Sequence, residues 1–316
     1  MARLVRLLLR TVLVLAALVL VKALWFQIYR LDGARALESG DRSDLLDRRA
    51  YLVERVTDPA FGPRSFPEAL GEQFRGEWAM VTMSMTGLAL ASMAHQFPRD
   101  RGTTGRDLDK LIDRATTTDL EAFDTDRWGA PARETLAGND GHIGYLGHLA
   151  LLLAADEMTF QGGANRVQIA ALSAAIVRKI TAAPCGLAET YPGEVYLPDN
   201  AVAIAALALA ERSNLGGPVP ALTLLQSMHA RYGRDDLLPF RVGPDCQGDH
   251  VRGSGAAWSL LYLGLVDEAY ARRGYESLKR TFFDTPAPGI AGFREWPRGD
   301  DRGGDVDSGP LPLGLS

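Results

Sequence analysis

One phrase recurs four times in the second half of this 316-residue chain and constrains its fold more than any other feature. A polar stretch rich in Gly, Asp or Asn leads each time into a helix of small apolar residues, at 139–142, 198–200, 252–255 and 305–310. The stretches lie roughly 50–60 residues apart, the period expected of stacked helix pairs. In such folds the polar ends of one helix set gather on one face. The repeat therefore predicts both the architecture and the position of a pocket.

Composition excludes several classes of function. The net charge is -5, and no basic patch is interleaved with aromatic residues, so we expect no nucleic-acid partner. Phosphate-binding loops, dinucleotide glycine patterns, nucleophile elbows and metal-ligand spacings are missing from the sequence, so we expect no cofactor and no metal site. Cys185 and Cys246 are the two cysteines. They form a disulfide in an oxidising compartment or remain two buried thiols, and the sequence leaves both alternatives open.

Residues 1–30 are predicted to form a membrane anchor. Three arginines within the first ten residues precede an apolar run over 11–29, about the length of a bilayer-spanning helix. Trp25 and Tyr29 suit the membrane interface, and no small-x-small cleavage site follows, which favours an anchor over a cleaved signal peptide. The arginines favour a cytoplasmic N-terminus, so the remainder is expected outside the cytoplasm.

Residues 31–316 are predicted to form one all-α domain. Apolar periodicity indicates helices over 41–57, 77–95, 105–124, 141–159, 164–182, 199–213, 219–233, 254–271 and 273–283. Small apolar helices (inner) alternate with amphipathic ones (outer), as in an (α/α) toroid or barrel of helix pairs. Short extended segments separate the pairs, and Pro192-Gly193 is expected at the centre of a type II turn in a β-hairpin.

Candidate site residues cluster around the polar stretches. The catalytic candidates are His148, Glu194, Asp199, His142 and Asp307. The substrate-binding candidates are Tyr145, Tyr191, Tyr196, Arg252, Glu295 and Trp296. Carboxylates beside aromatic walls and histidines are the usual material of acid–base sites, because partial desolvation moves their pKa values toward neutrality.

Structural roles compete with these functional ones. Side-chain oxygens can cap helix N-termini, and this explains four residues equally well: Asp140, Asp199, Ser254 and Asp307. His148 on an apolar helix face is compatible with a core histidine, and Arg294-Glu295 with a surface ion pair. Capping leaves His142, Glu194 and the neighbouring aromatic residues unexplained.

At these residues the sequence resembles the linalool dehydratase/isomerase family of α/α-barrel proteins. The resemblance is carried by FRGEW at 74–78, HIGYLGHLALLLAADEMTF, the PDN of LPDNAVAIAAL, GSGAAWSLLYLGLVDEAYARRGYESLKRTF and Arg294-Glu295. It implies a barrel whose pocket holds a small alcohol or alkene, with acid–base addition and removal of water. It also implies rings in which a neighbouring subunit closes the pocket, hence a homo-oligomer. His148 matches the family's histidine in the GHL triplet.

The sequence also departs from this family. The family's hydro-lyase site uses two cysteines flanking PDN, whereas Tyr196 and Ala205 fall near those places here. The YPGEVY segment adds carboxylate and aromatic groups. A six-pair toroid requires roughly two or three helices beyond Asp307, so we expect a barrel that is open, shortened or completed by a partner. The resemblance therefore extends to the fold and not directly to the reaction.

Three functional hypotheses follow. The leading one is a membrane-anchored acid–base lyase or isomerase acting on a small hydroxylated or isoprenoid substrate. Its groups are Glu194 or Asp199 as base, His148 or His142 as proton donor, and Tyr191 or Tyr196 as orienting groups. The alternative enzyme is a glycan hydrolase. Two carboxylates about 5–9.5 Å apart across an open groove would indicate it. A non-catalytic envelope binding or assembly protein predicts instead that Glu194, Asp199 and His148 share no cavity.

Overall fold

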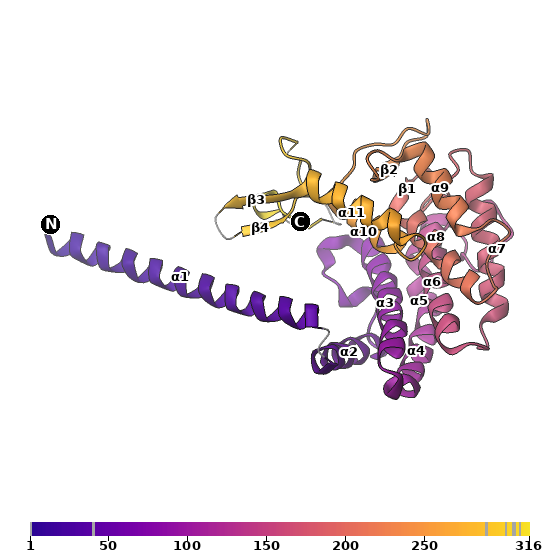
Figure 1. Cartoon of the computed structure of the whole chain (residues 1–316), viewed down its shortest axis with the longest axis horizontal. Coiled ribbons are helices and arrows are strands. Elements are labelled where there is room, and N and C mark those ends of the chain that lie inside the picture. The colour runs from indigo at the N-terminus through magenta and orange to yellow at the C-terminus, as the bar shows by residue number, and fades with distance from the viewer. Residues whose placement is uncertain (1, 40–41, 288–289, 301, 305–307, 310) are drawn as a thin grey trace. The chain divides into compact units, whose positions relative to one another are not determined.

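The computed structural model describes residues 2–39, 42–287, 290–300, 302–304, 308–309 and 311–316, and most of them are helical (Figure 1). The chain divides into two compact units, Met1–Glu54 and Arg55–Ser316. The predicted predominance of helix is confirmed. The arrangement of the helix pairs as an (α/α) toroid or barrel remains a prediction, because the structure establishes only which helices are neighbours.

The first unit contains α1 (Ala2–Ser39) and most of α2 (Arg42–Thr57). Within α1, Val5–Trp25 has a mean hydropathy of 2.4 and no buried residues. At about 1.5 Å per residue this stretch is about 30 Å long, enough to cross the hydrocarbon core of a bilayer. The predicted N-terminal helix is therefore present, and the domain boundary expected at residue 30 falls inside it.

The second unit contains the other long helices. These are α3 (Gly71–Gln96), α4 (Arg101–Ala115), α5 (Thr118–Trp128), α6 (Ile143–Phe160), α7 (Arg166–Ala182), α8 (Leu197–Arg212), α9 (Ala221–Tyr232), α10 (Gly253–Leu263) and α11 (Glu268–Phe282). Short 3₁₀ turns lie at Pro63–Ser65, Glu68–Leu70, Pro98–Asp100 and Pro312–Gly314.

Two predicted helices are each divided in the structure. The helix expected over 105–124 breaks because the hydroxyls of Thr116 and Thr117 donate to backbone carbonyls of α4, at 3.1 Å to Ile112 O and 2.7 Å to Arg114 O. Such bonds compete with continued helix. The helix expected over 254–271 ends at Leu263, and Asp267 starts α11 by accepting a 3.0 Å hydrogen bond from Tyr270 N.

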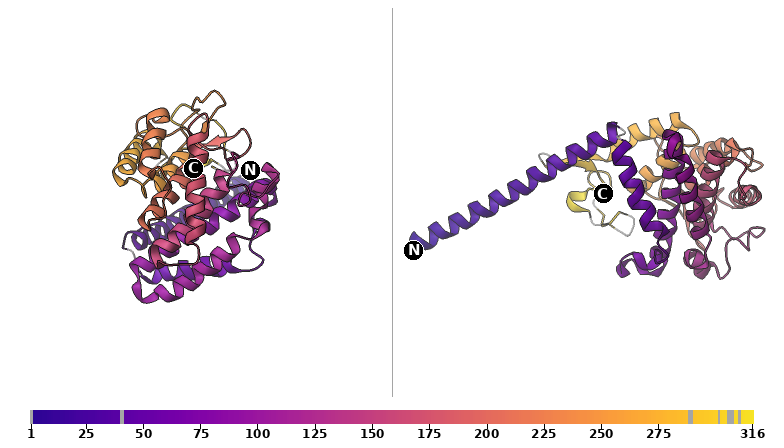
Figure 2. Two further views of the ribbon diagram at one scale, coloured as in Figure 1. Left: turned by 90° about the vertical axis from the view of Figure 1, so that its right-hand side faces the viewer. Right: turned by 90° about the horizontal axis from the view of Figure 1, so that it is seen from below.

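Four helices form an inner row in the order α3, α6, α8 and α10, with each packed against the next. α6 and α8 are buried along nearly their whole length, whereas α7 and α9 pack outside them (Figures 1 and 2). Gly147 of α6 lies against the backbone of Ala203 in α8, where an added Cβ would come within 3.2 Å of the Ala203 nitrogen. Small residues therefore permit the close approach of the two inner helices.

The outer helices are amphipathic, as predicted. On α11 the buried residues recur every three or four positions: Tyr270, Gly274, Ser277, Leu278 and Phe282. The small apolar composition of the inner helices and the one-sided composition of the outer ones thus follow their positions. Each helix buries the surface that its sequence makes apolar.

Short strands connect the helix pairs. β1 (Val195–Tyr196) pairs antiparallel with β2 (Arg241–Val242), so that Tyr196 lies opposite Arg241. Gly193 has φ +75°, as the third residue of a type II turn requires, and Glu194 N donates to Tyr191 O at 2.8 Å. The predicted turn is therefore present, although the ladder partner of β1 is β2. β3 (Phe283–Ala287) and β4 (Ile290–Phe293) form a second antiparallel pair.

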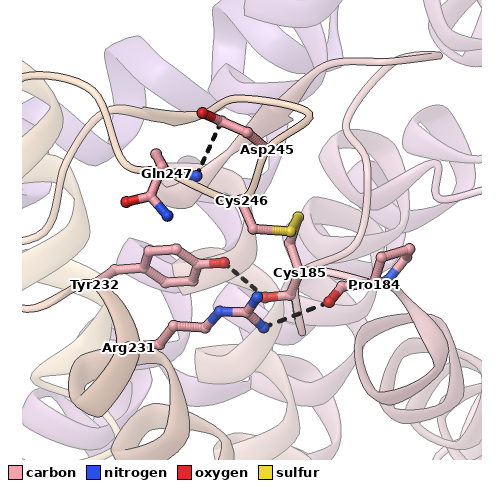
Figure 3. The surroundings of a disulfide bond; sticks show 7 residues. All are labelled: Pro184, Cys185, Arg231, Tyr232, Asp245, Cys246 and Gln247. Atoms are coloured by element: carbon pink, nitrogen blue, oxygen red, sulfur yellow. Dashed lines mark hydrogen bonds between the residues drawn. A yellow bond between two sulfur atoms is a disulfide. The ribbon is translucent and has the colours of Figure 1, made fainter.

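A disulfide joins Cys185, before the turn, to Cys246, in the loop after β2 (Figure 3). Tyr232 Oη donates to Cys185 O at 2.7 Å, and Arg231 donates to Pro184 O at 3.4 Å, as Figure 3 shows. Of the two alternatives left open by the sequence, the structure has the disulfide. The disulfide joins the segment that precedes β1 to the segment that follows β2.

Replacing both cysteines with serine should lower the free energy of unfolding by about 3–4 kcal/mol, because the bond closes a loop of 61 residues. Urea unfolding of the oxidised wild type and of the Cys185→Ser/Cys246→Ser variant measures the difference. Dithiothreitol should destabilise the wild type and leave the variant unchanged. Equal unfolding midpoints for reduced and oxidised wild type would contradict the assigned disulfide.

Candidate functional site

A cavity of about 590 Å³ lies in the second unit, with walls from α3, α6, α8, α10 and the β1–β2 ladder. This volume is typical of small-molecule sites. Its lining side chains that carry charge or exchange protons are Glu77, Arg127, His148, Tyr191, Glu194, Tyr196, Asp199, Arg241, Asp249 and Arg252. The lining aromatic residues without such groups are Phe74, Trp78, Phe240 and Trp258. The cavity therefore combines apolar walls with several polar groups.

Glu194 is held as an anion in the cavity wall. Its carboxylate accepts hydrogen bonds from Arg127 Nη2 at 2.6 Å and from Tyr196 Oη at 2.8 Å. Burial raises the pKa of Glu194, but the bonds from Arg127 and Tyr196 and the charges of Arg127 and Arg241 outweigh burial and leave the pKa below its ordinary value. Glu194 is thus an acceptor with a fixed charge rather than a proton donor at neutral pH.

Tyr191 links the turn to α3. Its Oη donates to Glu77 Oε2 at 2.8 Å, and the Arg127 guanidinium lies 4.7 Å from its ring centroid. Burial and then the charge of Glu77 raise the pKa of Tyr191, and Asp199 adds to this effect. The phenol therefore stays protonated, with carboxylates of α3 and α8 nearby.

Asp199 lies in the first turn of α8 and lines the cavity. Its Oδ2 accepts a 2.6 Å hydrogen bond from Thr190 Oγ1. The N-cap of α8 is Tyr196, so the prediction that Asp199 caps this helix is wrong. The carboxylate sits where the helix dipole favours negative charge.

His148 reaches the cavity from α6, and only 3% of it is exposed. Its Nδ1 lies 2.6 Å from Ser84 Oγ, and Ser84 Oγ also donates to Val81 O at 3.1 Å. Because Ser84 Oγ gives its one proton to Val81 O, it must accept a hydrogen bond from His148 Nδ1. The hydrogen bonds therefore assign the ring proton to Nδ1 and leave Nε2 as an acceptor. Burial lowers the pKa of His148 to about 4. The ring is therefore uncharged at neutral pH, with Nε2 as an acceptor, whereas the predicted donor role requires an imidazolium that burial disfavours.

His142 does not line the cavity. It precedes α6 in a left-handed conformation, with φ +51°, and is fully buried. Nδ1 is hydrogen-bonded to Asp124 Oδ2, Nε2 lies 3.2 Å from Thr135 Oγ1, and the ring packs on Trp128 at 4.6 Å. His142 therefore does not share a helix face with His148, because α6 begins only at Ile143.

Tyr145 is also outside the cavity. Its Oη donates to Ala115 O at 3.3 Å, and its ring packs edge-on against Phe123. A step of three residues along a helix turns a side chain by about 300°, so Tyr145 and His148 point in directions about 60° apart. Here that difference separates a core tyrosine from a cavity histidine.

Arg252 lines the cavity, and Glu295 supports it from behind. Glu295 is fully buried and binds Arg252 Nε, while it also accepts from Ser254 N at 3.0 Å and Ser254 Oγ at 2.9 Å. Glu295 therefore occupies the N-terminus of α10, where a Ser254 cap was predicted. Glu295 thus forms a buried ion pair with Arg252 rather than the surface ion pair with Arg294 that the sequence also allowed.

Of the two remaining candidate residues, Trp296 is not among the residues that line the cavity. Trp296 stacks on Arg252 with a 5.3 Å separation and donates from Nε1 to Gly303 O at 3.1 Å. Asp307 lies outside the described residues. The fourth polar stretch therefore cannot be placed beside the other three. Asp140, a third predicted cap, is replaced by His142 at the N-cap of α6.

Sequence reasoning missed Glu77, Arg127 and Arg241 as site residues. Glu77 and Trp78 lie in the FRGEW segment, so a charged residue on an otherwise apolar helix was the available signal. Arg127 comes from α5 and meets Glu194 only through tertiary packing. Trp78 and Trp258 likewise meet across the fold, edge to face at 6.2 Å.

Among the described residues, no group of three or more His, Cys, Asp and Glu side chains is arranged to hold a metal ion. No family model matches the chain, and no curated protein matches it either. The resemblance to the linalool dehydratase/isomerase family therefore stands on the quoted segments alone.

Burial of neutral His148 should make stability depend on pH. Its folded pKa of about 4 lies below the unfolded value of about 6.5, so the unfolded chain binds the proton first as pH falls. Stability present above pH 6.5 should be lost toward pH 4, by up to about 3 kcal/mol. Urea unfolding at pH 7 and pH 4.5 should show a smaller loss for His148→Gln than for wild type. Exposed His95→Gln, the matched control, should behave as wild type, and equal losses in all three chains would contradict the assignment.

Proposed function

We propose that the chain is an acid–base enzyme of the lyase or isomerase type, acting on a small hydroxylated or isoprenoid-like molecule. The observation that carries this proposal is that Glu194, Asp199 and His148 line one cavity. The non-catalytic hypothesis expected these three side chains to share none. Their common cavity favours an enzyme, and the family resemblance favours the addition or removal of water.

The lining supports a substrate with an apolar body and at least one hydroxyl. Phe74, Trp78 and Trp258 offer aromatic surface, and Trp258 also packs edge-on against His148 at 6.2 Å. Several polar groups lie on the turn and at the starts of α8 and α10, and Glu77, Arg127 and His148 add others from α3, α5 and α6. Such an arrangement suits a molecule whose reacting oxygen faces the polar side while its hydrocarbon contacts the rings.

Removal of water requires one group to protonate the departing hydroxyl and another to accept a proton from the neighbouring carbon. We assign acceptance to neutral His148, because burial keeps its ring unprotonated. Proton transfer to and from the oxygen is assigned to Asp199, which lines the same cavity and accepts a hydrogen bond from Thr190. Asp199 takes a proton from water during addition and returns it to the departing hydroxyl during removal. Glu194, fixed by Arg127, contributes constant negative charge to a developing cation.

A glycan hydrolase remains the second candidate, because charged groups are frequent in the lining. Four carboxylates and three arginines line the same cavity as the aromatic residues. Carboxylates and arginines bind sugar hydroxyls, and Trp78 or Trp258 can stack on a sugar ring. The separation between the two reacting carboxyl groups distinguishes retaining from inverting hydrolysis.

We further propose that the row of helix pairs belongs to an (α/α) barrel and that the chain forms a homo-oligomer, as the family resemblance implies. The domain is proposed to lie outside the cytoplasm, anchored by α1. The Cys185–Cys246 bond supports an oxidising compartment, and the N-terminal arginines support a cytoplasmic N-terminus.

Turnover by substituted chains tests the proposed function. The full chain in detergent is screened against terpenoid alcohols and oligosaccharides, and the best substrate is then used for variants. Asp199→Asn should lower kcat roughly 100-fold or more, since a positioned acid contributes about 10²–10⁴. Glu194→Gln should lower it less, because only the fixed charge is lost.

Exposed Asp113→Asn and Glu268→Gln are the matched controls and should retain full turnover. Circular dichroism shows whether each variant is folded. Wild-type turnover in both Asp199→Asn and Glu194→Gln would remove these residues from the catalytic account.

A further inference from the structure

Tyr262 of α10 is completely buried, and its Oη has no hydrogen-bond partner among the described residues. A buried hydroxyl that loses its hydration without a protein partner lowers stability. Phenylalanine would fill the same space without that cost. The hydroxyl of Tyr262 is therefore unexplained by packing alone.

Tyr262 lies directly behind the cavity wall. Its ring packs against Trp258 at 5.4 Å and edge-on against His148 at 6.3 Å, and both of these residues line the cavity. Burial raises the pKa of Tyr262, and the charge of Asp199, a residue of the same cavity wall as His148 and Trp258, raises it further. Tyr262 therefore packs against His148, and its phenol is affected by the charge of Asp199, the two groups assigned to proton transfer.

These groups have complementary hydrogen-bonding capacity. Tyr262 Oη offers a proton, and the Asp199 carboxylate accepts protons. His148 Nε2 makes no hydrogen bond to a described residue and is the acceptor of the assigned tautomer. A buried water makes about three hydrogen bonds, which is the number that one donor and two acceptors provide.

We propose that Tyr262 Oη, the Asp199 carboxylate and His148 Nε2 bind one hydroxyl oxygen, supplied by water or by the alcohol group of a substrate. The oxygen accepts a hydrogen bond from Tyr262. Water donates one proton to Asp199 and one to His148, whereas an alcohol donates its single proton to one of them. This inference rests on the proposed function, because it names where the added or departing oxygen lies.

Tyr270 provides a matched comparison within the same chain. It is also buried with an unpartnered Oη, but it packs on His229 at 5.3 Å and lies beside Asp236 and Arg273, none of which lines the cavity. Removing either hydroxyl should leave thermal stability unchanged or slightly raised, because neither has a protein partner. Only Tyr262 should affect an oxygen bound at the cavity.

Crystal structures of the full chain in detergent test the site directly. Without ligand, an ordered water should lie about 2.6–3.2 Å from Tyr262 Oη and from Asp199 or His148 Nε2. After soaking with 2-methylbut-3-en-2-ol, the alcohol oxygen should replace this water, and Tyr262→Phe should lose the bound oxygen. An empty position in both crystals, or direct contact of Tyr262 Oη with a protein acceptor, would overturn the proposal.

Fluorescence titration of the cavity tryptophans gives an independent measurement. Wild type and Tyr270→Phe should bind 2-methylbut-3-en-2-ol more tightly than isoprene, which lacks the hydroxyl. Tyr262→Phe should bind the alcohol roughly threefold to tenfold more weakly, as expected for one neutral hydrogen bond, with no change for isoprene. Equal alcohol affinity in wild type and Tyr262→Phe would contradict the inference.

The two proposals can fail separately. If the water is present but no alcohol binds or reacts, the small-alcohol function fails and the oxygen site stands. If alcohols are turned over while no oxygen binds at Tyr262, the function stands and the oxygen site fails.

Discussion

The close packing of α6 against α8 is the constraint on which the site depends. At Gly147 the helix backbones approach so closely that a Cβ has little room against Ala203. This approach brings His148, the residue after Gly147, to the same cavity as Asp199 in the first turn of α8. A larger residue at 147 would separate the helices and the two groups assigned to proton transfer.

Charge pairing divides the polar groups of the cavity into two kinds. Glu194 is paired with Arg127, and Arg252 with buried Glu295, so these charges stay fixed. Desolvated charges require such partners, because an unpaired buried ion is costly. The hydroxyls of Ser84 and Thr190 form hydrogen bonds with His148 and Asp199, the two groups to which the proposed mechanism assigns proton transfer.

Much of the secondary structure was predictable because apolar periodicity and burial agree. The inner helices α6 and α8 begin and end within two residues of their expected bounds. The division between α4 and α5 was missed because Thr116 and Thr117 act locally through their hydroxyls. Composition alone does not distinguish these bonds from continued helix.

The site was only partly predictable, for a related reason. Tyr191, Glu194, Tyr196 and Asp199 were found because they are adjacent along a turn and the helix that follows. Glu77 and Arg127 were missed because tertiary packing alone brings α3 and α5 to that turn. His142 was assigned to the site although its left-handed backbone directs it to Asp124.

The pH dependence of kcat/KM tests the central claim most directly, because it reports the pKa values of essential groups in the free enzyme. If neutral His148 accepts the proton, activity should persist as pH falls below 6 and decline only near pH 4, where its ring becomes charged. A decline centred near pH 6.5, as for a solvent-exposed histidine, would contradict the account. So would activity that rises as the ring is protonated.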